Sequence, residues 1–448
     1  MPMRLRRLLC VAYVVLFALV AFTAHPVVAQ TELSAKASQD VDESFHLLEQ
    51  TAYRQIGAQR IFDAARAGLL AYARKHGANA DVPVVRDSGD DAHALSDLDA
   101  AIENTAAAAH GDATDYAYAA IAGMAGAFDD RYTEFMTPEE YRAFNEALDP
   151  QRISGIGVLV EQDPVSSYIR FAYVLPNTPA DRAGLRIGDL LLSVEGTSTK
   201  GMPVDGVRNL LRGKAGTPVT IEVASSATAT PRSVTMTRSE VQPPTVVFKM
   251  LPDGIGYVWV IAFGRATPDE FNVALQRLRE QGARALVLDL RNDTGGYVNS
   301  ALDISSHFVG DQALMTVEER GDRATTYHSD DESQMGLPMT VLVNGYTASA
   351  SEITAGALQD DGVATLVGTK TFGKGVMQTL TELPDGAAIK ITTAHYLTPR
   401  HRDINLRGIA PDLTVDENRN ARFGELDRDA QLRAAVAYLQ RKIASLPR

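Results

Sequence analysis

The stretch from Val341 to Gln378 reads VLVNGYTASASEITAGALQDDGVATLVGTKTFGKGVMQ, and the interpretation of the whole chain depends on it. It opens with a short apolar run, Thr340 to Val343, which is typical of a β-strand. A turn pair and a series of small residues follow, and Glu352 to Leu358 then has a helical pattern. The sequence therefore predicts a strand that turns sharply into a helix, which starts near Ser349 or Ser351.

Such a turn places a serine hydroxyl clear of the sheet. It also places it at a helix N-terminus, where unpaired N–H groups and the helix dipole favour developing negative charge. Serine is a weak nucleophile near neutral pH and needs a base. A second predicted strand, Ala364 to Val367, leads to Lys374, which lies between two glycines and can act as a base if burial lowers its pKa. On this pattern alone the serines can equally be helix caps and Lys374 a surface charge, and both interpretations stay open.

Three sequence words resemble the carboxyl-terminal processing peptidases, the tail-specific proteases of family S41. They are NGYTASASEI at 344–353, ALQD at 357–360 and TFGKG at 371–375. This family carries a serine and a lysine 25 residues apart, a spacing that selects Ser349 for Lys374 and excludes the neighbouring Ser351 and Thr347. The family also has a glutamine four residues after the lysine, which here is Gln378. The resemblance, over about residues 110–445, implies that Ser349 and Lys374 are catalytic and that Gln378 orients the lysine.

The resemblance also implies where an oxyanion would bind. The run RNDTGG at 291–296 follows a predicted buried strand, Ala285 to Leu290, and precedes a predicted helix. In the family a glycine at this place and the residue after the serine form the oxyanion hole. These correspond to Gly295, with Gly296 as the alternative, and to Ala350. Two donors aimed at developing charge contribute a large part of catalysis. The chain has DTGG where the family often has NPGG, which is a mild departure.

Residues 153–240 resemble a PDZ domain. The resemblance lies in GIGV at 155–158, PNTPA at 176–180 and AGLRIGD at 183–189. The glycines of the first word predict a turn whose N–H groups can hold a carboxylate, and the alternation after it predicts a strand whose edge can accept a peptide. A helix over Val204 to Leu211 would lie across this groove. The predicted ligand-binding residues are Gly155, Ile156, Gly157, Val158, Val207 and Leu211. The alternative is a spacer domain with a non-functional groove.

The fold class that follows is a multidomain protein of α/β and α+β type. It has a helical N-terminal region, a PDZ domain and, by the resemblance, a crotonase/ClpP-like α/β serine protease core. In the helical region, Thr137 is predicted as the N-cap of a helix with Pro138 at its first position. The predicted regions are a signal peptide over 1–29, helices over 30–150, the PDZ domain over 153–240, the Ser-Lys protease core over 241–415 and a C-terminal helical segment of the core over 416–448.

Composition and charge restrict the partners. The chain has 448 residues, of which 45% are hydrophobic and 22% charged, as in ordinary globular proteins. Residues 1–29 contain three arginines, an apolar run and a small-residue end, which is typical of a secretory signal. The run is short for a membrane span, which favours a cleaved signal over an uncleaved membrane anchor, the alternative interpretation. Cleavage would change the net charge from −13 to −16, which counts against nucleic acid and anionic membranes as partners. The single cysteine, Cys10, lies in this segment, and the predicted location is periplasmic or secreted.

The predicted function is that of a serine endopeptidase, secreted or periplasmic, that recognises protein C-termini through its PDZ domain and cleaves by a Ser-Lys(-Gln) mechanism. Its partners would be protein or peptide substrates, and its N-terminal helices are candidates for homo-oligomer contacts. No metal or cofactor is expected, since His395 and His401 belong to no metal-ligand motif and His395 fits packing in a strand. The alternative is a catalytically silent peptide- or lipid-binding protein on the same fold, and membrane contact is expected only if the signal stays uncleaved.

The proposed contact between Lys374 and Gln378 makes a geometric prediction. In a straight strand, residues four apart are separated by roughly 13 Å. In a helical turn or a tight bend they come within about 6 Å. If Gln378 orients Lys374, the backbone between them is expected to curl, which Gly373 and Gly375 would permit.

Overall fold

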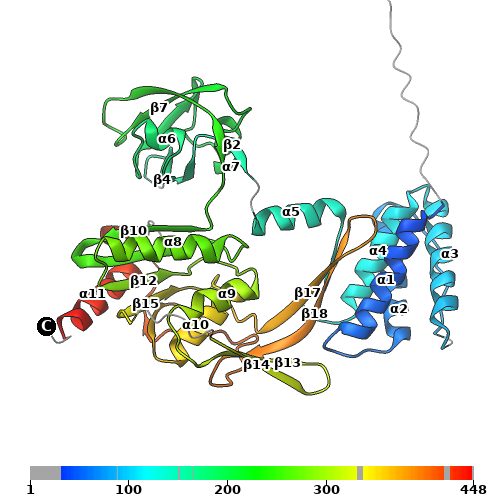
Figure 1. Cartoon of the computed structure of the whole chain (residues 1–448). Helices are drawn as coiled ribbons and strands as arrows, with labels where there is room; N and C mark the ends of the chain where they lie inside the picture. The colour runs from blue at the N-terminus through cyan, green and yellow to red at the C-terminus, as the bar shows by residue number, and fades with distance from the viewer. Residues whose placement is uncertain are drawn as a thin grey trace, which may run out of the picture.

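The computed structural model describes residues 32–87, 89–149, 152–163, 165–329, 336–417 and 424–445. Figure 1 shows a helical bundle, a small β-domain and an α/β core from which a long hairpin reaches the bundle. The predicted signal peptide, with Cys10, lies outside the described residues. Within those residues, no helix combines the length and the apolar character needed to cross a membrane.

The bundle contains the helices α1 (Ala35–Thr51), α2 (Ala58–Lys75), α3 (Asp91–Ala109) and α4 (Ala113–Gly126). Their apolar faces share one core, in which the rings of Phe45 and Phe62 stack with their centroids 4.7 Å apart. Helices α2 and α4 cross closely at Gly68 and Gly123. The crossing requires glycine, because a methyl group at either position would overlap a carbonyl oxygen of the other helix. These helices confirm the helical character predicted for the region.

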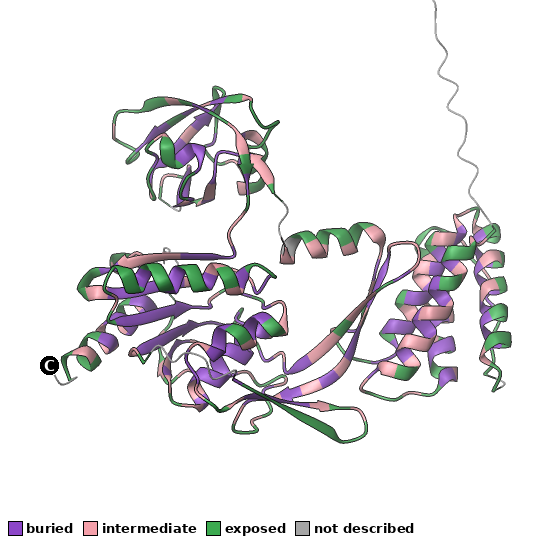
Figure 2. Ribbon diagram, in the orientation of Figure 1, coloured by how far each residue is buried: buried purple, intermediate pink, exposed green. Residues whose placement is uncertain are grey.

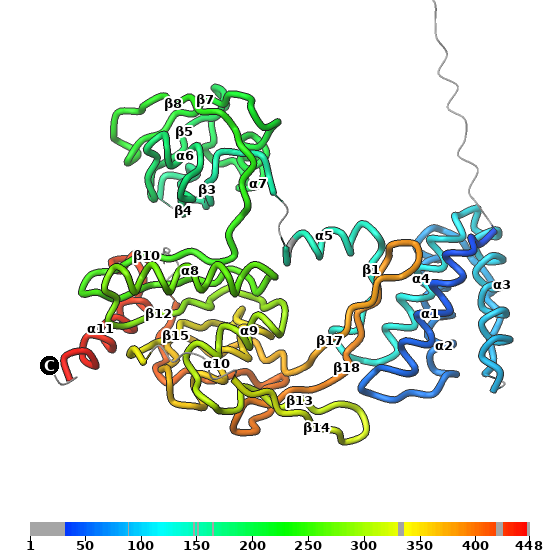
Figure 3. The backbone as a smooth tube through the Cα atoms, in the orientation of Figure 1, coloured from blue at the N-terminus to red at the C-terminus, as the bar shows by residue number. Residues whose placement is uncertain are grey.

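A connecting segment leads from the bundle to the β-domain and contains β1 (Glu134–Met136) and α5 (Pro138–Leu148). The predicted capping box at the start of α5 is confirmed, since the Glu140 N–H donates to the Thr137 hydroxyl and the Thr137 N–H donates to the Glu140 carboxylate. Strand β1 pairs with β18 of the core, so this segment runs beside the core hairpin (Figure 3).

The β-domain has its own core and a sheet in the order β3-β4-β5-β7-β8, with β6 paired to β5. Strand β3 is at one end of this order, and α7 packs beside it, which leaves a groove between them. The strands are β2 (Ile153–Gly155), β3 (Val158–Gln162), β4 (Ile169–Val174), β5 (Leu190–Val194), β6 (Thr197–Ser198), β7 (Pro218–Ala224), β8 (Arg232–Thr237) and β9 (Ser239–Val241), and the helices are α6 (Pro179–Arg182) and α7 (Val204–Leu211).

The α/β core is built on a sheet in the order β10-β11-β12-β15-β16-β19, parallel except for the β10–β11 pair. Every residue of β12 and β15 is buried (Figure 2), as expected for parallel strands covered on both faces. Helices α8, α9 and α10 cover one face and α11 the other. The strands are β10 (Val246–Leu251), β11 (Ile255–Val260), β12 (Ala285–Asp289), β15 (Met339–Val343), β16 (Ala364–Gly368) and β19 (Leu413–Thr414). The helices are α8 (Thr267–Glu280), α9 (Val298–Ser306), α10 (Ala350–Asp360) and α11 (Ala430–Ala444), with short 3₁₀ turns at Pro252–Gly254 and Leu426–Arg428.

A second sheet connects the core to the bundle. Its strands are β13 (Ala313–Glu319), β14 (Arg323–His328), β17 (Val376–Glu382) and β18 (Ala388–Leu397), together with β1. The turn between β17 and β18 inserts Leu383 and Ala387 into the hydrophobic core of the bundle, where the Tyr118 hydroxyl also donates a hydrogen bond to Asp385. Strand β14, at the other edge, is exposed at every residue (Figure 2).

Candidate active site

The predicted strand-turn-helix is confirmed between β15 and α10. Strand β15 ends at Val343, α10 begins at Ala350, and Ser349 occupies the N-cap position between them. Its backbone has φ 58° and ψ −119°, a left-handed conformation that L-residues with a side chain rarely adopt. Such strain persists only where the surrounding structure enforces it, and it is concentrated at functional sites.

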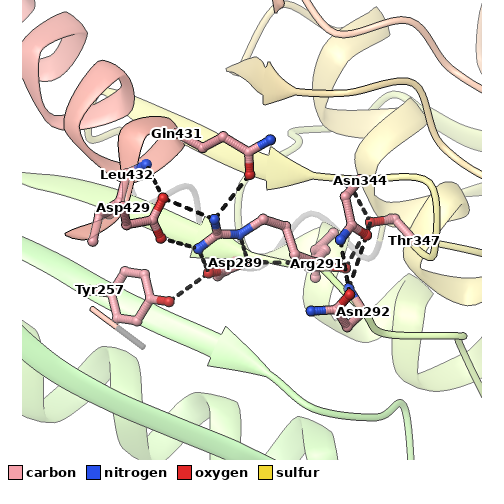
Figure 4. A network of polar contacts seen from close by, with 10 residues as sticks. Tyr257, Asp289, Arg291, Asn292, Asn344, Thr347, Asp429, Gln431 and Leu432 are labelled. Atoms are coloured by element: carbon pink, nitrogen blue, oxygen red, sulfur yellow. Dashed lines mark hydrogen bonds and ion pairs between the residues drawn. The ribbon is translucent and has the colours of Figure 1, made fainter. Parts of the chain in front are cut away.

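Hydrogen bonds to neighbouring loops enforce this turn (Figure 4). The Thr347 hydroxyl accepts from the Asn344 N–H at 2.9 Å and donates to the Leu290 carbonyl at 2.8 Å. The Asn344 amide group in turn donates to Asn292 Oδ1 at 2.9 Å. Because Leu290 and Asn292 follow β12, these bonds tie the serine turn to the loop after the neighbouring strand.

The loop after β12 is itself anchored through Arg291 (Figure 4). The guanidinium is nearly buried and bridges Asp289, at 2.6 Å, and Asp429, at 2.7 Å. The Tyr257 hydroxyl donates to the same Asp289 at 2.5 Å, and the Gln431 side chain accepts from Arg291 at 3.0 Å. This network holds the start of α11 against the sheet and fixes the base of the loop that contains the predicted oxyanion glycines.

The prediction that the Gly295 N–H binds an oxyanion disagrees with the structure. This N–H donates to Asp293 Oδ1 at 2.8 Å and is not free. Gly295 instead permits close packing, because a Cβ there would lie 2.8 Å from the Ala350 nitrogen and from the Ser349 Cβ. The N–H groups of Gly296 and Ala350 have no hydrogen-bond partner among the described residues. The alternative glycine, Gly296, therefore fits an oxyanion donor better.

Asp293, where the family often has asparagine, is a buried residue of this loop. Its side chain is 1% exposed, and burial raises its pKa to about 7. One carboxylate oxygen accepts from Gly295, and the other has no partner among the described residues. Its backbone carbonyl accepts from the Ala348 N–H and from the Ser351 hydroxyl. Ser351 is thus a buried structural residue, in agreement with the choice of Ser349.

Glu352 is the residue of this site that sequence reasoning did not identify. Its fully buried carboxylate accepts four hydrogen bonds: from the Thr371 hydroxyl at 2.5 Å, from the N–H groups of Gly373 and Lys374 at 2.8 Å, and from the Ser349 N–H at 3.1 Å. Burial raises its pKa, although these donors act in the opposite direction. The signal was an acidic residue three positions after the predicted N-cap serine, where it stabilises a helix start.

Lys374 lies in the same cavity as Ser349. Burial, together with the charge of Lys390, lowers the pKa of Lys374 to about 8, against the opposing effect of Glu134 and Glu352. Its carbonyl oxygen accepts from the Tyr396 hydroxyl at 2.6 Å, which fixes the backbone. A lysine with this pKa is partly neutral near neutral pH and can accept a proton.

The predicted curl between Lys374 and Gln378 is not formed. Strand β17 begins at Val376 and includes Gln378, and its one irregularity is a register shift between Met377 and Gln378. No hydrogen bond joins the Lys374 and Gln378 side chains, and the buried Nε2 of Gln378 has no partner within the described part of the chain. Both residues nevertheless line the same cavity.

This cavity has a volume of about 420 Å³ and combines polar and apolar walls. Gly295, Ser349, Lys374 and Gln378 line it, so the structure brings together residues that are up to 83 positions apart in sequence. The apolar walls include Phe144, Leu148, Ile353, Val376 and Leu380. A cavity with such polar and apolar walls can hold an extended peptide with its backbone near the serine.

A second cavity of about 420 Å³ lies in the β-domain, between β3 and α7. Five of the predicted ligand-binding residues line it, namely Gly155, Ile156, Gly157, Val158 and Leu211. The prediction for Val207 disagrees with the structure, because this residue does not line the groove and is fully buried in the hydrophobic core of the domain. Arg208 of the same helix and Arg212, the residue directly after it, line the groove instead, since the face of α7 that carries Val207 packs against the sheet.

Other polar groups lie outside these cavities. His395 is in β18, as expected, with its ring centroid 4.4 Å from that of Tyr53. In the helical bundle, His46, Glu49 and Asp91 each place one nitrogen or oxygen atom within 4.8 Å of the others, a grouping that is common at exposed acidic surfaces without a metal ion. The three residues are partly exposed and belong to neither cavity.

Comparison with known proteins agrees with these observations. The sequence profile of Peptidase family S41 matches residues 254–415, and the profile of the PDZ domain matches residues 170–225. A carboxyl-terminal-processing protease from Picosynechococcus sp. is 36% identical over 330 residues, which are 72% of this chain and 79% of that protein. The carboxy-terminal processing protease CtpA of Bacillus subtilis is 32% identical over 326 residues, 72% of this chain and 69% of that protein.

Among solved structures, a lipoprotein from Streptococcus agalactiae superposes with a TM-score of 0.51 over 92% of this chain and 98% of its own. Its sequence identity is 11%, so the likeness concerns the fold alone. The sequence relatives are informative about the family because they share about a third of their residues with most of this chain. The chain belongs to the carboxyl-terminal-processing proteases of peptidase family S41 and contains a PDZ domain.

Proposed function

We propose that this protease cleaves peptide bonds with Ser349 as the nucleophile and Lys374 as the general base. The observation that carries the proposal is the strained N-cap position of Ser349 in one cavity with Lys374, a lysine whose pKa is lowered to about 8. The strain presents the hydroxyl at the helix N-terminus, and the lowered pKa supplies a neutral amine at mildly alkaline pH.

The reaction follows from these groups. The Ser349 oxygen attacks the peptide carbonyl carbon while its proton passes to the neutral amine of Lys374. The carbonyl oxygen becomes an oxyanion, for which the free N–H groups of Gly296 and Ala350 are the candidate donors. Lys374 then gives its proton to the leaving amine, the C–N bond breaks, and water hydrolyses the acyl-enzyme in a second, equivalent step.

Gln378 is the candidate for orienting Lys374. It lines the cavity and has a buried amide nitrogen without a partner among the described residues, so no existing bond to that nitrogen has to break for it to bind the lysine. This role requires a conformation in which the backbone between Lys374 and Gln378 curls, unlike the one described above.

The PDZ groove is the candidate site for substrate C-termini. Gly155 to Val158 line the groove, and β3 offers an open strand edge along it. We further propose that the protein is periplasmic or secreted, in agreement with the sequence of residues 1–29, and that the N-terminal helices are the surface for any homo-oligomer.

The test is cleavage of a tagged, partly unfolded protein, with the products identified by mass spectrometry. Ser349→Ala and Lys374→Ala are expected to abolish cleavage while thermal unfolding hardly shifts. Ser351→Ala is the matched control, because Ser351 is buried away from the cavity and donates only to the Asp293 carbonyl. If Ser351→Ala is inactive and Ser349→Ala is active, the assignment of the nucleophile is wrong.

One observation favours the alternative of a catalytically silent, peptide-binding protein. In the described residues, no hydrogen bond connects Lys374 Nζ with Ser349 or Gln378. On this alternative, wild-type protein and Ser349→Ala would both bind peptides and neither would cleave them. Cleavage by wild type that Ser349→Ala lacks would exclude it.

A further inference from the structure

The wall of the active-site cavity includes residues from outside the peptidase region. Tyr132, Phe144 and Leu148 line the cavity, and all three precede residue 254, where the match to the peptidase family begins. They belong to the segment that contains β1 and α5, and β1 pairs with β18 of the core. The cavity is therefore incomplete without this N-terminal segment.

Within this segment, Tyr132 lies against the amine that we propose as the base. The Nζ of Lys374 is 5.0 Å from the centroid of the Tyr132 ring. A cation within about 6 Å of a ring face is attracted by the ring quadrupole. Among the described residues, Nζ has no ion-pair or hydrogen-bond partner. Its contact with the Tyr132 ring is therefore the polar interaction that the structure shows for it within this part of the chain.

The ring is held in place by a tight turn. Asp130 Oδ1 accepts from the N–H groups of Tyr132, at 2.7 Å, and Thr133, at 2.6 Å. Thr392 of β18 donates to Thr133 Oγ1 through its N–H and to Asp130 through its hydroxyl. Tyr132 is thus fixed relative to β18, whereas Lys374 ends in a long and flexible side chain.

We propose that Tyr132 is a positioning residue, which holds the Lys374 Nζ over its ring face and so completes the active site from outside the peptidase core. The proposal rests on the proposed function of Lys374. The other charged groups that face this amine are Lys390 on β18, Glu134 on β1 and Glu352 on α10.

The ring has a definite electrostatic effect on the amine. A ring face attracts the ammonium form more than the neutral amine, so it favours protonation. It therefore opposes burial and the charge of Lys390, which lower the pKa of Lys374. Loss of the ring with retention of an apolar side chain is expected to lower this pKa further and to leave the amine less well placed.

Substitutions at Tyr132 can separate the contribution of its ring from that of its hydroxyl group. The Tyr132 hydroxyl is buried without a hydrogen-bond partner in the described part of the protein, so Tyr132→Phe keeps the ring face and removes no such bond. Tyr132→Leu removes the ring face and keeps a bulky apolar group over the amine. Tyr132→Met serves as a second variant of this kind if the leucine variant does not fold.

The first measurement is the pH dependence of kcat/KM for cleavage. The wild type and Tyr132→Phe are expected to share the same alkaline-rising limb. In Tyr132→Leu or Tyr132→Met the limb is expected to move to lower pH by about 0.5–1 unit, from the usual strength of such contacts at 1.36 kcal/mol per pH unit. The maximal kcat is expected to fall several-fold because the amine is less well positioned. A limb at the wild-type pH in both variants would overturn the proposal.

The second measurement does not depend on cleavage. In a Ser349→Ala background, the rate at which an amine-selective reagent labels Lys374, followed by mass spectrometry against pH, reports the pKa of this lysine. Tyr132→Leu is expected to lower it, whereas Tyr346→Leu, which removes an exposed tyrosine from the same cavity, is expected not to. Equal pKa values in the Tyr132 and Tyr346 variants would contradict the proposal.

The two proposals fail in distinguishable ways. If Lys374→Ala retains cleavage, the proposed role of the lysine is wrong. If Lys374→Ala is inactive while the Tyr132 variants keep the wild-type pKa of Lys374, only the positioning role of Tyr132 is wrong.

Discussion

The active-site cavity has two sides that are built differently, a nucleophile side around Ser349 and a lysine side around Lys374, named after the proposed roles of these residues. On the nucleophile side, the Glu352 carboxylate accepts four hydrogen bonds and connects Ser349 to the loop before Lys374. On the lysine side, the side-chain ends of Lys374, Gln378 and Tyr132 have no hydrogen-bond partners among the described residues. The backbone is fixed on both sides, but only on the nucleophile side does a buried side chain, that of Glu352, form a hydrogen-bond network that holds it.

This difference indicates how the site divides its roles. A strained serine must be held by its surroundings, and the buried carboxylate and the bonds around Thr347 provide that support. A base must take up and release a proton, and the Lys374 amine has no hydrogen-bond partner among the described residues that competes for this proton. Changes to the groups that hold the serine turn, such as the Glu352 carboxylate, should therefore damage both stability and activity, whereas changes on the lysine side should alter activity and its pH dependence.

The largest effect is expected for Glu352→Ala. The substitution leaves four donors without their acceptor in a buried site, and each such group costs about 1–3 kcal/mol. We expect the free energy of unfolding to fall by about 3 kcal/mol or more and cleavage to be lost. Urea unfolding and the cleavage assay measure the two effects. A stable, active Glu352→Ala variant would show that the nucleophile side is not held in this way.

The next effect concerns pH. Protonated Lys374 cannot accept the serine proton, so cleavage should be low below its pKa of about 8 and rise as pH increases through that value. Lys390→Gln removes a positive charge that lowers this pKa, so the rise should move to higher pH. Glu134→Gln removes a negative charge that raises it, so the rise should move to lower pH.

The pH profiles of kcat/KM between pH 6 and 10 test these opposite shifts. Lys390 and Glu134 form an ion pair with each other, which makes the two variants a matched pair. Shifts in the same direction would mean that the variants act through structure rather than charge. A flat wild-type profile, with chemistry shown to limit the rate, would contradict Lys374 as the base.

A smaller effect is expected for Gln378→Ala. If Gln378 orients Lys374 during the reaction, kcat should fall by about tenfold, the loss expected for one hydrogen bond of roughly 1.4 kcal/mol. Stability should change little, because the Nε2 of Gln378 has no hydrogen-bond partner in the described residues that would be lost. Single-turnover kinetics together with thermal unfolding test this expectation. A wild-type rate would exclude the orienting role in every conformation.

The smallest effect is expected at the PDZ groove, because this groove would bind the C-terminus of the substrate and lines neither side of the active-site cavity. Peptides with a free C-terminus should have a KM several-fold lower than amidated copies, with similar kcat. Steady-state kinetics on matched peptides provide the test. Equal KM values would remove the carboxylate-reading role of Gly155 to Val158 and leave the peptidase assignment intact.

The sequence by itself determined the strand-turn-helix around Ser349. The apolar run of β15, the small residues after it and the pattern of α10 act locally, so their period and turn chemistry are readable without tertiary contacts. The family words and the 25-residue spacing added the pairing of Ser349 with Lys374, and the structure places both residues in one cavity. The capping box at Thr137 and the helix over Val204–Leu211 are further local features that the sequence predicted correctly.

Only the tertiary structure decided how the remaining groups are used. In the sequence Glu352 is an ordinary helix-start residue, whereas in the structure it accepts hydrogen bonds from the loop before Lys374. The Gly295 N–H is bonded to Asp293. Val207 and Arg208 are neighbours in sequence, and their exchange of roles depends on which face of α7 packs against the sheet. Tyr132 joins the cavity because β1 pairs with a strand more than 250 residues later. The Gly295–Asp293 bond spans only two residues, but it depends on the conformation of a loop that Asn344 and Asp429 hold in place. The physical reason is therefore shared: hydrogen-bond partners and burial depend on segments that are distant in sequence, and no local pattern encodes them.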